Sequence, residues 1–247
     1  MLLVADVHGS NRALARLARS GEPLLVLGDL LDLFDYRTGK GLMAELVGRE
    51  LVLEFVRLRE HGEGAAARAV WRSFEEEHAE EMGAGFDRMV QAGYAEVAEA
   101  LAGAEAYVTF GNADQPDLLR RSLPPGVRFV DGEVVEIEGL RVGFAGGGLT
   151  YPGRVGEDEL AAKLDGLGPV DVLCTHVPPA VSPLGRDVIS GRAKQSPAVL
   201  EYLLAHRPRW HYFGDVHQPQ AVSWRVGKTM CRNVGHFRAT GRAVRHG

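Results

Sequence analysis

The sequence predicts an α/β fold built on parallel strands, and three observations favour this class. Short apolar runs bounded by turn signals alternate with longer segments of helical spacing. The run at residues 2–5 precedes a helix candidate that ends near Gly21 and then a second run at residues 24–27, which together form a βαβ unit. Each run also ends in polar residues, at the edge where open α/β sheets place their ligand-binding side chains.

The length of 247 residues suits one large domain, which we expect to cover residues 1–247. No internal repeat, linker or low-complexity segment suggests a division. The net charge of −5 argues against non-specific nucleic-acid binding, which usually needs a basic surface. This charge does not exclude a nucleotide held by metal ions.

The compartment expected from the sequence is the cytoplasm. No apolar run approaches the ~20 residues of a membrane span, and Met1 leads directly into a polar motif without a secretory leader. Cys174 and Cys231 both lie in apolar runs, so we expect two buried core cysteines rather than a disulfide framework.

The segment at approximately residues 40–105 has a different character from its flanks. Leu, Ala, Glu and Arg dominate it, and its apolar residues recur at helical spacing. It predicts a helical insertion of two to four helices, which would serve as a cap over the site or as a partner surface.

The later part of the chain returns to strand-like runs. These predict strands over residues 106–110, 127–130, 133–138, 141–145, 170–175 and 210–213, and helices over 116–120, 157–167 and 196–205. Beyond residue 217 apolar and polar residues alternate, which predicts antiparallel strands.

Metal-ligand residue types recur at the ends of five of these strands. In chain order they are Asp6 and His8, Asp29, Asn112, His176, and Asp215 and His217. Core packing does not explain such repeated placement, so the pattern predicts a metal centre. Asp6 and His8, two residues apart on extended backbone, would point to the same side and hold one ion. Asp29 would bridge two ions ~3.5–4 Å apart.

As an ordered set these motifs resemble the calcineurin-like metallophosphoesterases. The residues that carry the resemblance are Asp6-Val7-His8, Gly28-Asp29-Leu30-Leu31-Asp32, Gly111-Asn112-Ala113-Asp114, Thr175-His176 and Gly214-Asp215-Val216-His217. The resemblance covers residues 6–217 and implies a four-layer sandwich, with two central mixed β-sheets flanked by helices. It also implies a hydrolase acting on a phosphomonoester or phosphodiester by a metal-bridging hydroxide.

The resemblance further implies a distribution of ligands between two divalent ions. Asp6, His8, Asp29 and His217 would hold the first ion, and Asp29, Asn112, His176 and Asp215 the second. Asn112 would also contact the substrate phosphate and assist catalysis. Mn²⁺ is the favoured metal, while Fe, Zn²⁺, Co²⁺ and Ni²⁺ suit the same donors. The expected partner is a small phosphorylated or nucleotide-like substrate, and the oligomeric state stays open.

Two positions depart from the family pattern. Ala113 stands where the family has a histidine that contacts the phosphate and protonates the leaving group, and general acid catalysis is typically worth 10²–10⁴-fold. Asp215 stands where the family has a histidine. Either Asp215 ligates and makes the second site harder, favouring Mn²⁺ or Mg²⁺, or it does not reach and the second ion binds weakly.

Further residues are weaker candidates. His236 would face the metals and act catalytically, or it is a packing histidine. Arg186, Arg192 and Lys194, on the loop after His176, would contact a substrate phosphate, or they are solvated charges. Asp32 and Asp114 are expected to cap helices or to orient ligands rather than to bind metal.

The two departures leave open a function of another class. The alternative to a phosphoesterase is a metal- and nucleotide-binding regulatory protein with little or no catalysis.

Overall fold

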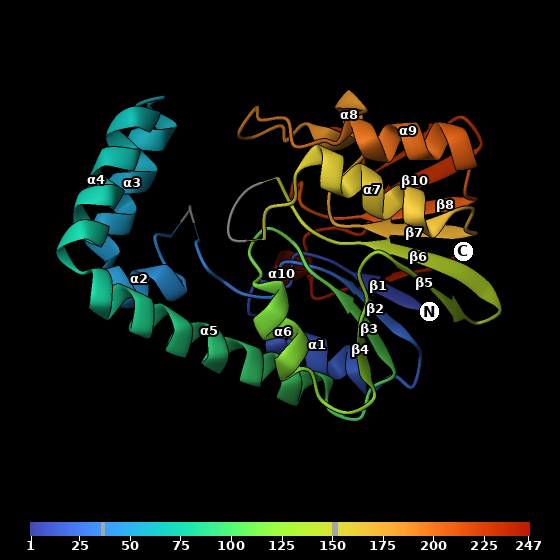
Figure 1. Ribbon diagram of the computed structural model, residues 1–247, viewed down its shortest axis with the longest axis horizontal. Coiled ribbons are helices and arrows are strands. Elements are labelled where there is room, and N and C mark those ends of the chain that lie inside the picture. The colour runs from blue at the N-terminus through green and yellow to red at the C-terminus, as the bar shows by residue number, and fades with distance from the viewer. Residues whose placement is uncertain (36–37, 150–152) are drawn as a thin grey trace.

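A computed structural model describes residues 1–35, 38–149 and 153–247. Two mixed β-sheets pack face to face, and helices cover the outer face of each, so the architecture has four layers (Figure 1). This confirms the predicted α/β class and the two mixed sheets flanked by helices.

The first sheet has the strand order β11-β1-β2-β3-β4. Its strands are β1 (Leu2–Val4), β2 (Leu24–Leu27), β3 (Ala106–Thr109), β4 (Val127–Phe129) and β11 (Val244–Arg245). The strands β1 to β4 are mutually parallel, and β11 pairs antiparallel with β1. The βαβ unit predicted at the start of the chain is therefore present.

The second sheet has the order β5-β6-β7-β8-β10-β9. Its strands are β5 (Glu133–Ile137), β6 (Leu140–Ala145), β7 (Val172–Thr175), β8 (Trp210–Phe213), β9 (Ser223–Val226) and β10 (Thr229–Asn233). The strands β6, β7, β8 and β10 are parallel. Antiparallel strands are predicted beyond residue 217. Strand β10 does pair antiparallel with β9, but its other neighbour, β8, is parallel to it. Alternation of residues shows that a strand has two different faces but not which neighbour it pairs with.

The layers follow from the alternation of side chains along strands that are buried on both faces. Leu3 and Leu25 point between the sheets, where they join the core that contains Phe144 and Cys174. Val26 points the other way and joins the buried residues that the helices contribute. Continuous apolar runs are therefore required in these strands, because neither face meets water.

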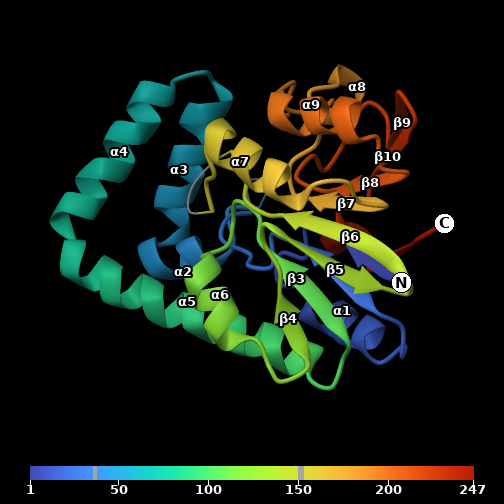
Figure 2. The same cartoon turned by 45° about the vertical axis from the view of Figure 1, so that its right-hand side comes forward.

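The helices divide between the two outer faces (Figures 1 and 2). On the first sheet lie α1 (Asn11–Ala18), α6 (Pro116–Ser122) and the second half of α5 (Ala79–Leu101), and α7 (Glu157–Leu167) and α9 (Pro197–His206) cover the second. The short helices α8 (Ser182–Gly185) and α10 (Phe237–Thr240) lie in connections. Among the described residues, no helix combines the length and the apolar character that crossing a membrane requires.

The predicted helical segment forms four helices that we call the helical arm: α2 (Leu42–Val47), α3 (Arg49–Glu60), α4 (Gly64–Glu77) and α5. In both views α3 and α4 stand away from the sheets. A small apolar core of their own, including Met43, Val52 and Val56, holds them together. The arm joins the sandwich through α5, whose Val90, Tyr94 and Val97 are buried with the main core.

Candidate metal centre

The candidate ligands converge where strands of both sheets end. Asp6 and His8 follow β1, Asp29 follows β2, His176 follows β7, and Asp215 and His217 follow β8. The backbone ties these strand ends together, because Asp6 N–H donates to Gly28 O at 3.1 Å and Gly214 N–H donates to His176 O at 3.0 Å. The sequence placed these residues at one sheet edge, and the structure brings them together across two sheets.

Four of these residues adopt left-handed backbone. Their φ values are +56° at Asp6, +41° at His8, +56° at Asp29 and +64° at Asp215, whereas only two other non-glycine residues in the described part of the chain have positive φ. Such a conformation costs a residue with a Cβ roughly 1–2 kcal/mol. Four residues with this strained backbone conformation lie in one place. Such clustering indicates a functional site, where the required side-chain positions outweigh the energetic cost of the backbone strain. It also corrects the reason given for the Asp6–His8 pair: the segment is not extended, and the two side chains meet because the chain turns sharply.

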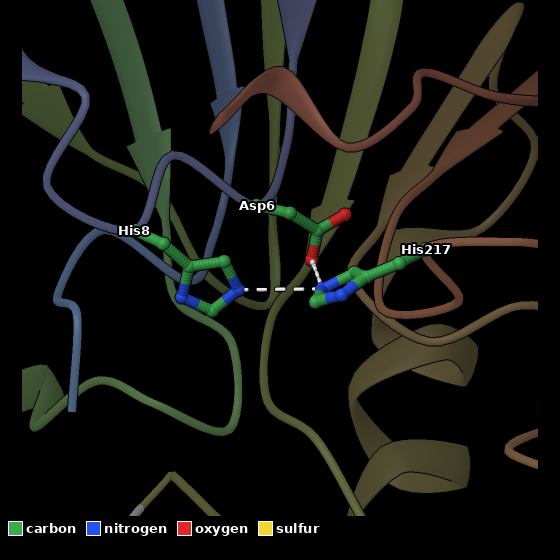
Figure 3. Close-up of side chains that lie close together, drawn as sticks. All are labelled: Asp6, His8 and His217. Carbon is green, nitrogen blue, oxygen red and sulfur yellow. Dashed lines mark hydrogen bonds and ion pairs between the residues drawn. The ribbon is translucent and has the colours of Figure 1, made fainter. Parts of the chain in front are cut away.

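The first ligand group consists of Asp6, His8 and His217, whose donor atoms all lie within 4.8 Å of one another (Figure 3). His217 Nε2 lies 3.5 Å from Asp6 Oδ1 and 3.3 Å from His8 Nε2. The side chain of His217 is 35% exposed while that of Asp6 is fully buried. The group is therefore open to solvent on the His217 side.

The second ligand group consists of Asp6, Asp29 and His176. His176 Nε2 lies 3.4 Å from Asp29 Oδ1, and the other oxygen of the same carboxylate, Oδ2, lies 3.7 Å from His8 Nε2. Asp29 thus directs one oxygen toward each group. This is the arrangement that a carboxylate shared between two cations requires.

Backbone carbonyls orient two of the imidazoles. Nδ1 of His8 lies 3.1 Å from Leu31 O, and Nδ1 of His176 lies 2.7 Å from Leu27 O. A carbonyl oxygen only accepts, so Nδ1 is the donor in each ring. The neutral tautomer then has its lone pair on Nε2, directed into the centre, as in histidines that bind metal.

Two buried polar atoms in the centre have no hydrogen-bond partner among the described residues: Asp6 Oδ2 and His176 Nε2. Leaving such an atom unsatisfied costs about 1–3 kcal/mol. A divalent cation bound by these ligand groups would provide a partner for both atoms. The mixture of carboxylate and imidazole donors fits a transition-metal ion such as Mn²⁺, without fixing which metal is bound.

The charges of the centre perturb one another strongly. Burial raises the pKa values of Asp6 and Asp29, but the nearby imidazoles outweigh this effect, so both carboxyl groups have lowered pKa values. Burial opposes protonation of His176, yet the charges of Asp29, Asp215 and Asp6 raise its pKa to about 10. Without a metal, therefore, a proton occupies His176, and a cation must displace it.

Asp215 and Asn112 lie beside the second group, and their predicted role as ligands of the second ion stays a prediction. Asp215 Oδ1 is 4.0 Å from His176 Nε2, and the ammonium group of Lys194 forms a hydrogen bond to this same oxygen. Oriented to suit its neighbours, the Asn112 amide donates to Asp215 Oδ1 at 3.1 Å and accepts from Ala113 N–H at 3.3 Å. For Asn112 and Asp215 to bind one cation together, the Asn112 amide would have to rotate until its oxygen, rather than its nitrogen, faces the cation.

The contact between Lys194 and Asp215 is not among the features predicted from the sequence, where Lys194 either binds a substrate phosphate or is a solvated charge. The signal that could have revealed the pair is Asp215 itself, because a third buried acid beside Asp6 and Asp29 requires a compensating positive charge.

His236 lies against the first group. Its ring stacks on that of His217, with centroids 3.9 Å apart, and meets His8 edge-on at 6.0 Å. Burial and the neighbouring His217 lower its pKa to about 4, so the imidazole is neutral at pH 7. The catalytic role predicted for His236 stays a prediction.

Arg186 and Arg192, predicted to bind substrate, are exposed on the loop that leads to Lys194. Within the described residues, no hydrogen bond or ion pair joins their guanidinium groups to the ligand groups. Their role also stays a prediction.

Ala113 is buried in an apolar cluster, and its N–H donates to Asp29 Oδ1 at 2.7 Å, so its backbone rather than its side chain serves the centre. A Cβ on Gly148 would collide with Asn112, so a glycine at position 148 allows tight packing against the Asn112 loop.

Comparison with solved structures finds the same fold at low sequence identity. One crystal structure matches with a TM-score of 0.59 and 17% identity, over 96% of this chain and 90% of that chain. The crystal structure of TT1561 of Thermus thermophilus matches with a TM-score of 0.54 and 11% identity, over 98% and 96% of the two chains. No family model and no curated protein matches the sequence. At these identities the matches establish the shared architecture only.

Proposed function

We propose that this protein is a metal-dependent phosphoesterase that hydrolyses a phosphomonoester or a phosphodiester. The observation that carries the proposal is the position of Asp29 between two Asp/His groups, with one carboxylate oxygen directed toward each. The unsatisfied atoms Asp6 Oδ2 and His176 Nε2 support a cation at this place. The ordered motifs that resemble the calcineurin-like metallophosphoesterases support the reaction class.

In this proposal the two ligand groups hold divalent cations, with Mn²⁺ favoured. Asp6, His8 and His217 would hold one, His176 would contribute to a second, and Asp29 would be shared. Bound cations would lower the pKa of a coordinated water and neutralise charge on phosphoryl oxygens.

The chain's own residues would prepare this chemistry by fixing the donors in advance. Leu27 O and Leu31 O hold the rings of His176 and His8 so that neither ring must reorient when a cation arrives. The partly exposed His217 leaves the solvent side of the first group open to a small substrate. The amide of Asn112, at the edge of the second group, would donate to a phosphoryl oxygen.

The test is turnover of bis-p-nitrophenyl phosphate and p-nitrophenyl phosphate with added Mn²⁺. We expect wild-type protein to hydrolyse at least one of them, and Asp29→Asn to lose at least about 100-fold in rate. The matched control is Asp158→Asn, an exposed acid in the first turn of α7, which should leave the rate unchanged. Absence of turnover with every divalent metal, in folded and metal-loaded protein, would refute the proposal.

A second candidate function is a metal- and nucleotide-binding protein with little or no catalysis. It is favoured by the buried methyl group of Ala113, which supplies no acid to a leaving group, and by the pairing of Asp215 with Lys194. Tight binding of AMP or ATP in calorimetry, together with no hydrolysis of either, would favour this second function.

A further inference from the structure

Lys194 places a fixed positive charge at the edge of the metal centre. Its ammonium group donates to the carboxylate of Asp215 and, at 3.1 Å, to the backbone oxygen of the same residue. The side chain of Asp215 is only 1% exposed, so this pair is shielded from water on the acid side. Screening by solvent, which weakens most surface pairs, is therefore reduced here.

The backbone around Lys194 is held in place. Lys194 N–H donates to Gly185 O at 2.8 Å, and Ser196 N–H donates to Pro178 O at 2.9 Å. Asp187, near the start of the same loop, accepts Gln218 N–H at 3.2 Å, which ties the loop to the segment that follows His217. The backbone that carries Lys194 is thus fixed, while its side chain is 37% exposed and is held by its contacts with Asp215.

The acid that Lys194 neutralises lies beside the second ligand group, although the charge of Lys194 also acts on His217 of the first group. Its partner atom, Asp215 Oδ1, lies 4.0 Å from His176 Nε2, which in turn lies 3.4 Å from Asp29 Oδ1. His176 and Asp29 belong to the second group, His8 and His217 belong to the first, and Asp6 belongs to both. A cation in the second group would meet a like charge at short range, where repulsion is stronger than in bulk water.

We propose that Lys194 competes with the cation of the second group and so makes the two metal affinities unequal. The inference rests on the proposed metal centre and adds a property to it. The first group binds its cation tightly, and the second binds one at least about tenfold more weakly, because the ammonium already neutralises Asp215. Occupancy of the second group then depends on the available concentration of divalent metal.

The experiment is a titration of metal-free protein with Mn²⁺, with free Mn²⁺ measured by electron paramagnetic resonance and bound Mn²⁺ by equilibrium dialysis. Wild-type protein should bind two ions in separate steps. Lys194→Met should tighten the second step at least about tenfold, and by more than it tightens the first. Lys194→Gln, which also removes the charge, provides a second variant should the methionine variant fail to fold.

Lys163→Met is the matched control. Lys163 is also a partly buried lysine paired with an acid, Asp131, at 2.9 Å, but it lies on α7 outside the ligand groups. Its substitution should change neither step. Equal wild-type affinities, or a second step unchanged in both Lys194 variants, would overturn the inference and leave the phosphoesterase proposal standing. Failure to bind any Mn²⁺ would overturn both.

Discussion

The carboxylate of Asp114 accepts the backbone N–H of Asp29 at 2.8 Å, and in this way one buried acid fixes another. Asp114 also accepts the N–H groups of Leu30 at 3.1 Å and Gly111 at 2.9 Å, so it joins the loops that follow β2 and β3. Burial and the charge of Asp29 raise the pKa of Asp114 to about 7. The position of Asp29 between the ligand groups depends on this acid, as the sequence analysis expected of a residue that orients ligands.

Asp114→Ala should therefore destabilise the protein and weaken metal binding together. The substitution leaves three buried N–H groups without an acceptor, and we expect a loss of about 3 kcal/mol or more in the free energy of unfolding. Denaturant titration measures this loss. Asp117→Ala, a change at an exposed acid on α6, should cost less than about 0.5 kcal/mol. Similar losses for the two variants would show that Asp114 has no anchoring role.

Gly111→Ala should impair the centre for a steric reason. A Cβ on Gly111 would lie 2.6 Å from His176 Cε1 and would collide with the Asp29 carboxylate. We expect Mn²⁺ affinity, measured by calorimetry, to fall at least about tenfold. Gly166→Ala is the control, because the same methyl group in α7 meets nothing within 4 Å and should raise stability slightly. Unchanged Mn²⁺ affinity in the Gly111 variant would contradict the described geometry.

The raised pKa of His176 predicts how stability depends on pH. The folded-state pKa of about 10 exceeds the ordinary value of 6.5, so the metal-free protein gains stability from protonation that is fully present below pH 6.5. This contribution is lost as pH rises toward 10. The free energy of unfolding of metal-free protein should fall over that range, and His176→Asn should show a smaller fall. Equal falls in the two proteins would contradict the assignment.

Mn²⁺ binding should show the opposite dependence on pH. A metal ligand must be deprotonated, so each cation bound at His176 releases a proton and the apparent affinity rises with pH. Calorimetry in buffers of different ionisation enthalpy counts the released protons. A count of zero at neutral pH would mean that His176 is not a ligand.

Much of the centre could be predicted from the sequence because its ligands follow apolar runs. His176 comes directly after a strand that is buried on both faces, and Asp6 and Asp29 each follow such a strand after one intervening residue. Strands of this kind are readable as apolar runs. The left-handed backbone at Asp6 and Asp29 was not predictable, because nothing in either motif distinguishes an extended residue from a turned one.

Asp215 signals that a positive charge is needed, but the sequence could not identify Lys194 as its source, for a different reason. The two residues are 21 positions apart, with the whole of α9 and β8 between them, so only tertiary structure brings them together. The sequence also could not predict that α3 and α4 extend away from the sheets. Helical spacing of apolar residues shows that a helix has a buried face but does not show which element covers that face.

The burial of Ala113 predicts a strong dependence of any hydrolysis on the leaving group. Without an imidazole at this position, esters with basic leaving groups lose an acid worth 10²–10⁴-fold. A series of aryl phosphodiesters of increasing leaving-group pKa should show a steep fall in rate. Ala113→His should raise the rate most for the most basic leaving groups, although crowding its apolar neighbours should cost about 1–3 kcal/mol of stability. Equal effects across the series would show that position 113 has no part in proton transfer.

The most direct test of the central claim is a crystal of this protein soaked in Mn²⁺ and measured for anomalous scattering. Our account predicts a manganese peak in contact with Asp6, His8, His217 and Asp29. Absence of any peak beside these four side chains, in crystals that bind manganese elsewhere, would contradict it.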